Sequence, residues 1–263
     1  MQLQVQGQTA YVYTANHALD PARPTVVFIH GAGGDHAVWA LQSRYFAYHG
    51  HNLLAVDLPG HGRSQGNPLA SIAAMADWVV ALLDAAGAGK AALVGHSMGS
   101  LIALNAAACF PERVEKIALL GTVAPMQVSA GLLEAAEHQE HEAFDMINLW
   151  GHAPVSHLGG NTFPGVWMMG SYLRLLERTA PGTLYRDFAA CNSYTSGLED
   201  AARVVCPALL ILGARDQMTP PRRARDLAAA IKGSRTVLLD AAGHAMMAEQ
   251  PDWVLDELID FLT

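Results

Sequence analysis

Residues 95–99, Gly-His-Ser-Met-Gly, constrain the fold of this chain more than any other segment. An apolar run at 91–94 precedes them, and an apolar, alanine-rich run at 101–109 follows. This context is typical of a strand that turns sharply into a helix, with glycines where a Cβ atom would clash. The pattern therefore predicts a turn that lifts the Ser97 side chain clear of a sheet, beside the N-terminus of a helix.

Short apolar, β-branched runs recur along the rest of the chain, and stretches with helical character separate them. We expect strands at 25–29, 52–56, 90–94, 116–120, 208–212 and 236–239. We expect an antiparallel edge hairpin at 3–14, and helices at about 38–48, 69–86, 98–110, 220–231 and 251–262. Because strands and helices alternate, the predicted fold class is α/β, with a doubly wound, mostly parallel sheet flanked by helices.

One segment breaks this alternation. Residues 122–205 contain no run typical of a core strand, and helix formers are concentrated at 132–150 and 167–179. An insertion of about 80 residues between two strands is too long for an ordinary loop. We therefore predict a helical cap at 122–205 over the carboxyl ends of the strands, and a core made of residues 1–121 and 206–263.

A serine in such a turn needs partners, because its hydroxyl is a weak nucleophile near neutral pH. It requires a base, and the base requires an acid that orients it; the expected chain order is serine, acid, histidine. Asp216 follows the expected strand at 208–212, and His244 follows the expected strand at 236–239. The carboxyl ends of parallel strands meet at one edge, so we predict Ser97, Asp216 and His244 as a catalytic triad.

Other polar residues near these motifs have plainer interpretations. Asp240 and Asp200 compete with Asp216 for the role of the acid. Asp240 is too near the histidine in sequence to reach its Nδ1 easily, and Asp200 belongs to the exit of the predicted cap. His30 and His61 are expected to bond backbone groups in their loops.

A nucleophilic serine also needs two N–H donors for the oxyanion that it generates. One donor is expected to be the backbone N–H of Met98, which follows the serine directly. The second is expected from the glycine-rich loop at 30–34, where Ala32 is the preferred donor and Gly31 and Gly33 are alternatives. These groups would form an oxyanion hole.

Four motifs are spread over nearly the whole chain: His30-Gly31, Asp57-Leu58-Pro59-Gly60-His61-Gly62-Arg63-Ser64, residues 95–99, and Gly243-His244 followed by Glu249-Gln250-Pro251. In these motifs the chain resembles the α/β-hydrolase fold family, of the small, capped serine hydrolase type. The family implies a triad, a two-donor oxyanion hole and a variable cap, but it does not imply one substrate. Serine in place of aspartate at the turn disfavours epoxide opening and halide displacement.

The predicted function is hydrolysis of a carboxylic ester, a lactone or a thioester through an acyl-enzyme on Ser97. The substrate is expected to be small to medium in size and largely apolar, and Trp167, Met168 and Met169 are expected to contact it. Four alternatives stay open. They are a small-molecule receptor of this fold with little turnover, a cofactor-free perhydrolase, a carbon–carbon hydrolase and a hydroxynitrile-type lyase.

Composition excludes several other classes. The formal net charge is −8 and the longest basic block is Arg222-Arg223, so we expect no nucleic-acid partner. We find no signal peptide at the N-terminus and no apolar run of the ~18 residues that span a bilayer. We therefore predict a cytoplasmic protein with a small-molecule, ester-like substrate and no membrane partner, and a homodimer stays open.

No cofactor or metal is expected. The three cysteines lack metal-type spacing and are expected to be reduced. His138 and His141 stand three residues apart in an acidic run, but they do not form the His-Glu-x-x-His pattern of a zinc helix. Mixed charge of this kind usually marks a solvated helix face.

Overall fold

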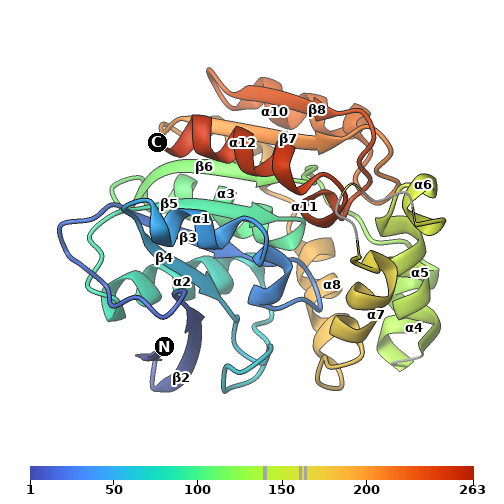
Figure 1. Ribbon diagram of the computed structural model, residues 1–263, viewed down its shortest axis with the longest axis horizontal. Coiled ribbons are helices and arrows are strands. Elements are labelled where there is room, and N and C mark those ends of the chain that lie inside the picture. The colour runs from blue at the N-terminus through green and yellow to red at the C-terminus, as the bar shows by residue number, and fades with distance from the viewer. Residues whose placement is uncertain (139–140, 160–161, 163–164) are drawn as a thin grey trace.

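The computed structural model describes residues 1–263 apart from 139–140, 160–161 and 163–164 (Figure 1). Within this part of the chain an eight-stranded sheet has the order β1-β2-β4-β3-β5-β6-β7-β8. β1 and β2 form an antiparallel edge hairpin, β2 pairs antiparallel with β4, and the remaining neighbours pair in parallel. The predicted α/β fold with a mostly parallel sheet is confirmed. The strands are β1 (Gln2–Val5), β2 (Gln8–Tyr13), β3 (Thr25–Ile29), β4 (Asn52–Val56), β5 (Ala91–His96), β6 (Val114–Leu120), β7 (Ala208–Gly213) and β8 (Arg235–Leu239).

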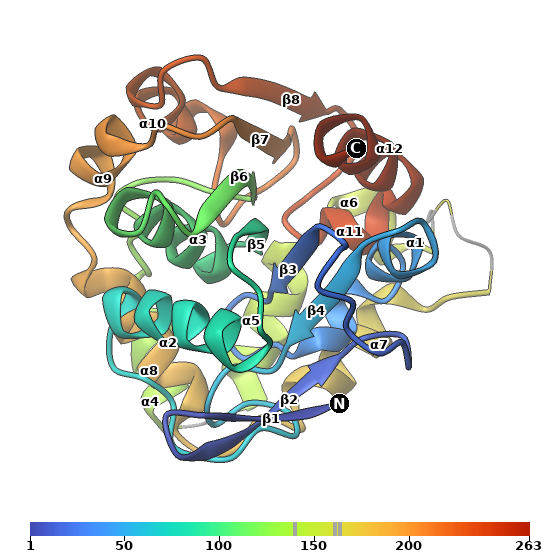
Figure 2. The ribbon, with the colours of Figure 1, turned by 90° about the vertical axis from the view of Figure 1, so that its left-hand side faces the viewer.

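Helices cover both faces of the sheet, as Figure 2 shows. The strands β3, β4, β5 and β7 are therefore buried along their whole length, which explains their continuous apolar sequences. Two apolar clusters fill the space on the two sides. One face carries α2 (Ile72–Ala85), α3 (Met98–Cys109) and α10 (Arg225–Ala230), and the 3-10 helix η2 (Pro221–Ala224) leads into α10. The other face carries α1 (Ser43–Tyr48), α11 (Met246–Glu249) and α12 (Pro251–Leu262), with the 3-10 helix η1 (His36–Trp39) beside them.

Helix ends follow ordinary capping chemistry. α2 begins after Ser71, whose hydroxyl accepts a hydrogen bond from the N–H of Ala74 at 3.2 Å. Pro251 occupies the first turn of α12, where a missing N–H costs nothing. α2 has fourteen residues, and in the described ranges no helix is long and apolar enough to cross a bilayer.

The chain between β6 and β7 is helical, and Figure 1 shows α4 to α8 gathered at one end of the sheet. The expected helices at 132–150 and 167–179 correspond to α4 with α5 and to α7. α8 and α9 were not predicted, because α8 has a mixed sequence with few strongly apolar residues and α9 is only seven residues long. The assignment of residues 122–205 as a separate cap stays a prediction. The helices are α4 (Ala130–His138), α5 (His141–Gly151), α6 (Pro154–His157), α7 (Met168–Leu176), α8 (Thr183–Ser193) and α9 (Gly197–Arg203).

Candidate active site

Ser97 occupies a strained turn between β5 and α3. Its backbone has φ +52° and ψ −120°, a region that side-chain-bearing residues rarely adopt. A Cβ atom on Gly95 would lie 2.1 Å from the carbonyl oxygen of Gly99, and one on Gly99 would lie 2.3 Å from that of Ile29. The turn therefore requires both glycines. Their absent side chains let the strand, the turn and the adjoining loop approach closely enough to present the serine.

Asp216 and His244 form a buried pair at the ends of β7 and β8. The imidazole Nδ1–H donates to the Asp216 Oδ2 at 2.7 Å, which leaves the His244 Nε2 as the nitrogen able to accept a proton. The other carboxylate oxygen, Oδ1, accepts the backbone N–H groups of Met218 and Thr219, both at 2.8 Å. Burial by itself would raise the pKa of Asp216, but the charge of His244 and the hydrogen bonds from His244 and Thr219 outweigh it and hold the pKa below its ordinary value.

The two competing acids lie elsewhere. Asp200 accepts a hydrogen bond from Asn105 at 2.8 Å and pairs with Arg203 at 2.5 Å, so its carboxylate is occupied in fastening α9. Asp240 is exposed. Of the three acids considered, the structure therefore brings Asp216 to His244.

Thr219 is a polar neighbour that sequence reasoning missed. Its hydroxyl donates to the Asp216 Oδ2 at 2.6 Å and lies 3.1 Å from the His244 Nδ1. The Asp-x-x-Thr spacing was the available signal, but the same spacing is common in turns that have no catalytic partner. Thr219 limits rotation of the carboxylate and therefore helps to hold the imidazole in one orientation.

Ser97 and His244 share no hydrogen bond in the described part of the chain. The Ser97 Oγ points to the Met126 Sδ at 4.0 Å, and the His244 Nε2 is buried without a partner. His96, the residue before the serine, donates its Nε2–H to the carbonyl oxygen of His244 at 2.9 Å, and the two rings lie 4.6 Å apart. The structure thus joins the acid to the histidine and places the histidine loop against the serine turn.

The loop after β3 lies beside Ser97. Ala32 lines the same cavity as the serine, and in the described residues no group accepts its backbone N–H. Gly33 holds the loop, since its N–H donates to Asp187 of α8 at 2.8 Å and its carbonyl accepts the Thr179 hydroxyl at 2.7 Å. Met98 is the first residue of α3, where backbone N–H groups have no partner within the helix.

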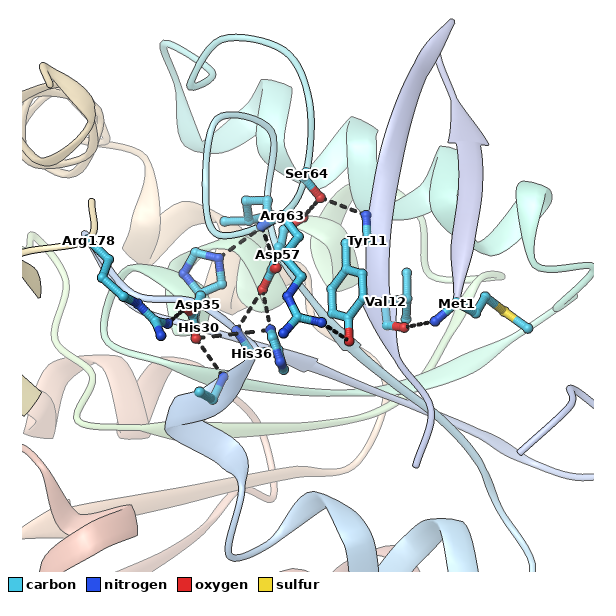
Figure 3. Close-up of polar contacts among 12 residues, drawn as sticks. Met1, Tyr11, Val12, His30, Asp35, His36, Asp57, Arg63, Ser64 and Arg178 are labelled. Carbon is cyan, nitrogen blue, oxygen red and sulfur yellow. Dashed lines mark hydrogen bonds and ion pairs between the residues drawn. The ribbon is translucent and has the colours of Figure 1, made fainter. Parts of the chain in front are cut away.

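A polar network around Asp35, His36 and Asp57 also supports this loop, as Figure 3 shows. The Asp57 carboxylate accepts from the Nδ1–H of His36 at 2.7 Å and from the N–H of Arg63 at 2.9 Å. Asp35 pairs with Arg178 at 2.6 Å. Ligand atoms of Asp35, His36 and Asp57 lie within 4.8 Å of one another, so they could be mistaken for a metal site. Both carboxylates and the His36 Nδ1 are already engaged by protein groups, so we interpret the cluster as a support for the loop.

The histidines at 30, 61 and 141 also have protein partners. His30 accepts the N–H of Leu58 at 3.1 Å through its Nε2. His61 donates one ring N–H to the carbonyl of Pro59 at 3.0 Å and the other to Asp187 at 2.8 Å. His141 pairs with Glu177 at 2.8 Å, while Gln139 and Glu140 of its acidic run lie outside the described residues.

A cavity of about 220 Å³ opens beside Ser97. Its described walls include apolar side chains from three helices between β6 and β7, namely Leu132 of α4, Trp150 of α5 and Phe188 of α8. A volume below the ~300–1,000 Å³ of typical ligand sites fits a small molecule. The arrangement offers a hydroxyl, an N–H donor and a largely apolar surface to the same ligand.

The three residues expected to contact substrate do not line this cavity. Trp167 is 75% exposed on the surface. Met168 is buried and lines a different cavity, beside His152 and Tyr172, and Met169 uses its carbonyl to accept a hydrogen bond from Asn148 at 3.0 Å. The helical side chains that line it instead include residues of α4, α5 and α8, whose relative placement no local sequence pattern specifies.

Glu249 braces the loop that carries His244. Its buried carboxylate accepts the N–H of Gly243 at 2.7 Å, and also the N–H of Ala153 and the hydroxyl of Ser156, each at 2.7 Å. These donors come from the histidine loop and from the start of α6. The position of the histidine is therefore tied to the helical segment between β6 and β7.

Two buried, neutral histidines should make the protein acid-sensitive. Burial and the charge of His244 lower the pKa of His96 to about 3, and burial and the charge of His61 lower the pKa of His30 to about 4. The unfolded chain binds these protons near pH 6.5, so stability is full above that pH and is lost as the pH falls toward 4. We expect a loss of about 2 kcal/mol for each ring between pH 8 and pH 5. Urea unfolding at both pH values measures it, and an unchanged midpoint would contradict this expectation.

Comparison with known proteins gives consistent matches. The alpha/beta hydrolase fold family matches residues 24–251. The (E)-2-((N-methylformamido)methylene)succinate hydrolase of Acinetobacter baylyi is 26% identical over 237 residues, covering 87% of this chain and 86% of that protein. The pimeloyl-(acyl-carrier protein) methyl ester esterase of Neisseria meningitidis is 29% identical over 206 residues, covering 73% and 74%. The solved enol-lactonase from Burkholderia xenovorans LB400 superposes with a TM-score of 0.87 at 23% identity, covering 100% and 99% of the two chains, and indicates the fold alone.

Proposed function

The chain belongs to the alpha/beta hydrolase fold family, and on this premise we propose that it is a serine hydrolase that cleaves small, largely apolar carboxylic esters. Lactones and thioesters are included, because they present the same carbonyl carbon. The observation that carries the proposal is the 2.7 Å pair of His244 and Asp216 beside the strained turn of Ser97. The printed name of the Neisseria relative, a methyl ester esterase, supports the ester class.

In the first half of the proposed reaction, the Ser97 Oγ attacks the carbonyl carbon while the His244 Nε2 takes its proton. Asp216 stabilises the imidazolium that forms, and Thr219 keeps the carboxylate in place. The N–H groups of Ala32 and Met98 stabilise the tetrahedral oxyanion. His244 then protonates the leaving alcohol, and the acyl group stays on the serine.

In the second half, water attacks the acyl-enzyme and His244 removes the water proton. The proton then returns to the Ser97 Oγ as the carboxylic acid leaves. Both halves require the Ser97 Oγ to leave the Met126 Sδ and approach the His244 Nε2. Catalytic hydrogen bonds are often long or misaligned without substrate and tighten when it binds.

We propose that residues 122–205 serve as a cap over this site. Leu132, Trp150 and Phe188 of this segment form apolar walls next to Ser97, and they would exclude water from the reacting ester. α8, the helix of Phe188, also holds the oxyanion loop through Asp187. A cap that both encloses the ester and fixes the loop would couple substrate entry to the geometry of the N–H donors.

A panel of 4-nitrophenyl esters, lactones and thioesters tests the proposed function. We expect steady turnover of short-chain esters, and a phosphonate probe that adds its mass to the tryptic peptide containing Ser97. Binding of esters without turnover would favour a small-molecule receptor. The observation on the side of a receptor is that the His244 Nε2 has no hydrogen bond to Ser97. Release of cyanide from a cyanohydrin would identify a lyase instead of an esterase. Cleavage of a carbon–carbon bond in a diketone would identify a carbon–carbon hydrolase.

A further inference from the structure

Arg223 is the charged side chain among the described residues that line the cavity beside Ser97. The hydroxyl and amide side chains of that lining are neutral: Ser97, Gln127, Ser129, Gln217 and Thr219. The Arg223 guanidinium donates one hydrogen bond, to the carbonyl of Pro125 at 3.2 Å. No described Asp or Glu lies within 4.0 Å of it, so its charge is not neutralised by an ion pair.

The segment around Arg223 is basic in a chain of net charge −8. Arg215, Arg222 and Arg225 stand within eight residues of it, and in the described structure none of them pairs with a carboxylate within 4.0 Å. Two acids also stand within eight residues of Arg223. Asp216 is buried against His244 and does not offset the charge at the surface, whereas the exposed Asp226 offsets one of the four positive charges and leaves the segment basic. Unpaired positive charge at one cavity mouth attracts anions to that mouth.

The remaining walls of the cavity favour a ligand whose middle part is apolar. Leu132 and Phe188 face a volume of about 220 Å³ that also contains the Ser97 hydroxyl. A ligand that touches both Ser97 and Arg223 therefore needs an ester at one end, a short apolar chain and a negative group at the other end. A carboxylate matches the planar fork of a guanidinium, which can bind both of its oxygens.

We propose that this site selects esters whose acyl chain ends in a carboxylate, with Arg223 as the specificity-determining residue. The inference rests on the proposed esterase function and adds a substrate class to it. Arg223 is exposed, so water and salt weaken the ion pair, and the expected preference is about 5-fold rather than larger. The contact binds substrate and takes no part in bond making, so it should act mainly on KM.

Two esters of equal chain length test the proposal: the mono-4-nitrophenyl ester of adipic acid and 4-nitrophenyl hexanoate. We expect the ratio of their kcat/KM values to fall about 5-fold in Arg223→Gln. Arg222→Gln is the matched control, because this neighbouring exposed arginine does not line the cavity, and it should leave the ratio unchanged. Equal ratios in the wild type and both variants would overturn the proposal while leaving the esterase function intact.

A binding measurement separates this inference from the function on which it rests. Monomethyl adipate and methyl hexanoate are titrated by calorimetry into Ser97→Ala protein, which needs no turnover. If neither chromogenic ester is hydrolysed, the proposed function fails, and the titration then decides. Tighter binding of the adipate by about 5-fold, removed by adding Arg223→Gln, would support carboxylate recognition. Equal affinities, or no binding of either compound, would overturn it.

Discussion

Replacing Ser97 by alanine is expected to lower kcat for ester hydrolysis by about 10³-fold or more. The change removes the Oγ that would form the acyl-enzyme and leaves the N–H donors of Ala32 and Met98 in place. Besides Thr219, whose hydroxyl donates to Asp216, two other potential nucleophiles line the cavity, Ser129 and Cys191. Burial and the nearby charge of Asp187 raise the pKa of the Cys191 thiol, so it stays protonated. Ser129 has no histidine partner among the described residues and cannot substitute.

Initial rates of a 4-nitrophenyl ester at saturating concentration measure this loss, and thermal unfolding of the same samples controls for folding. Alanine keeps the Cβ at φ +52°, so the strain of the turn is retained and the unfolding midpoint should change little. Ser129→Ala is the matched control, since it removes a hydroxyl from the same cavity. A Ser97→Ala protein that kept more than a tenth of the activity would show that the nucleophile lies elsewhere.

The parts of the site that sequence could predict depend on short-range patterns. Five consecutive residues predict the turn at Ser97. The crowding that requires Gly95 arises within the turn itself, from Gly99 and Ser100, whereas Gly99 is required by the close approach of Ile29 and His30 at the end of β3. Asp216 and His244 were found by their positions after strands, and parallel pairing brings such ends together wherever the sheet is regular. The turn and the two strand ends therefore do not depend on how the helices between β6 and β7 pack.

The parts that sequence could not predict depend on long-range packing. Met168 and Phe188 are both apolar, helical and inserted between β6 and β7, yet Met168 lies in a separate cavity and Phe188 faces Ser97. The difference is set by the placement of α7 and α8 around an apolar cluster shared with α4 and α5. No pattern inside either helix encodes that placement. Arg223 is a similar case, because an arginine after a strand is an ordinary surface residue until a cavity opens beside it.

Asp216→Asn is expected to lower kcat by about 10⁴-fold while the fold is kept. In the carboxylate, Oδ1 accepts two backbone N–H groups, from Met218 and Thr219, and Oδ2 accepts the Nδ1–H of His244. An asparagine must present its carbonyl oxygen to the two backbone donors, so its NH₂ group replaces Oδ2 and faces the imidazole. The His244 Nδ1 then becomes the acceptor and the proton moves to Nε2, which can no longer take a proton from Ser97.

Single-turnover rates of the Asp216→Asn protein and NMR of its imidazole nitrogens measure the two parts of this argument separately. Thr219→Val is the matched control, because it removes the other hydrogen bond to the Asp216 Oδ2 and keeps the negative charge and the Nδ1–H donor. Its loss should stay near 10-fold, the size of one hydrogen bond to a charged group. If Asp216→Asn and Thr219→Val lost activity equally, the carboxylate would only fix the loop, and the selection of one imidazole tautomer would have no part in the rate.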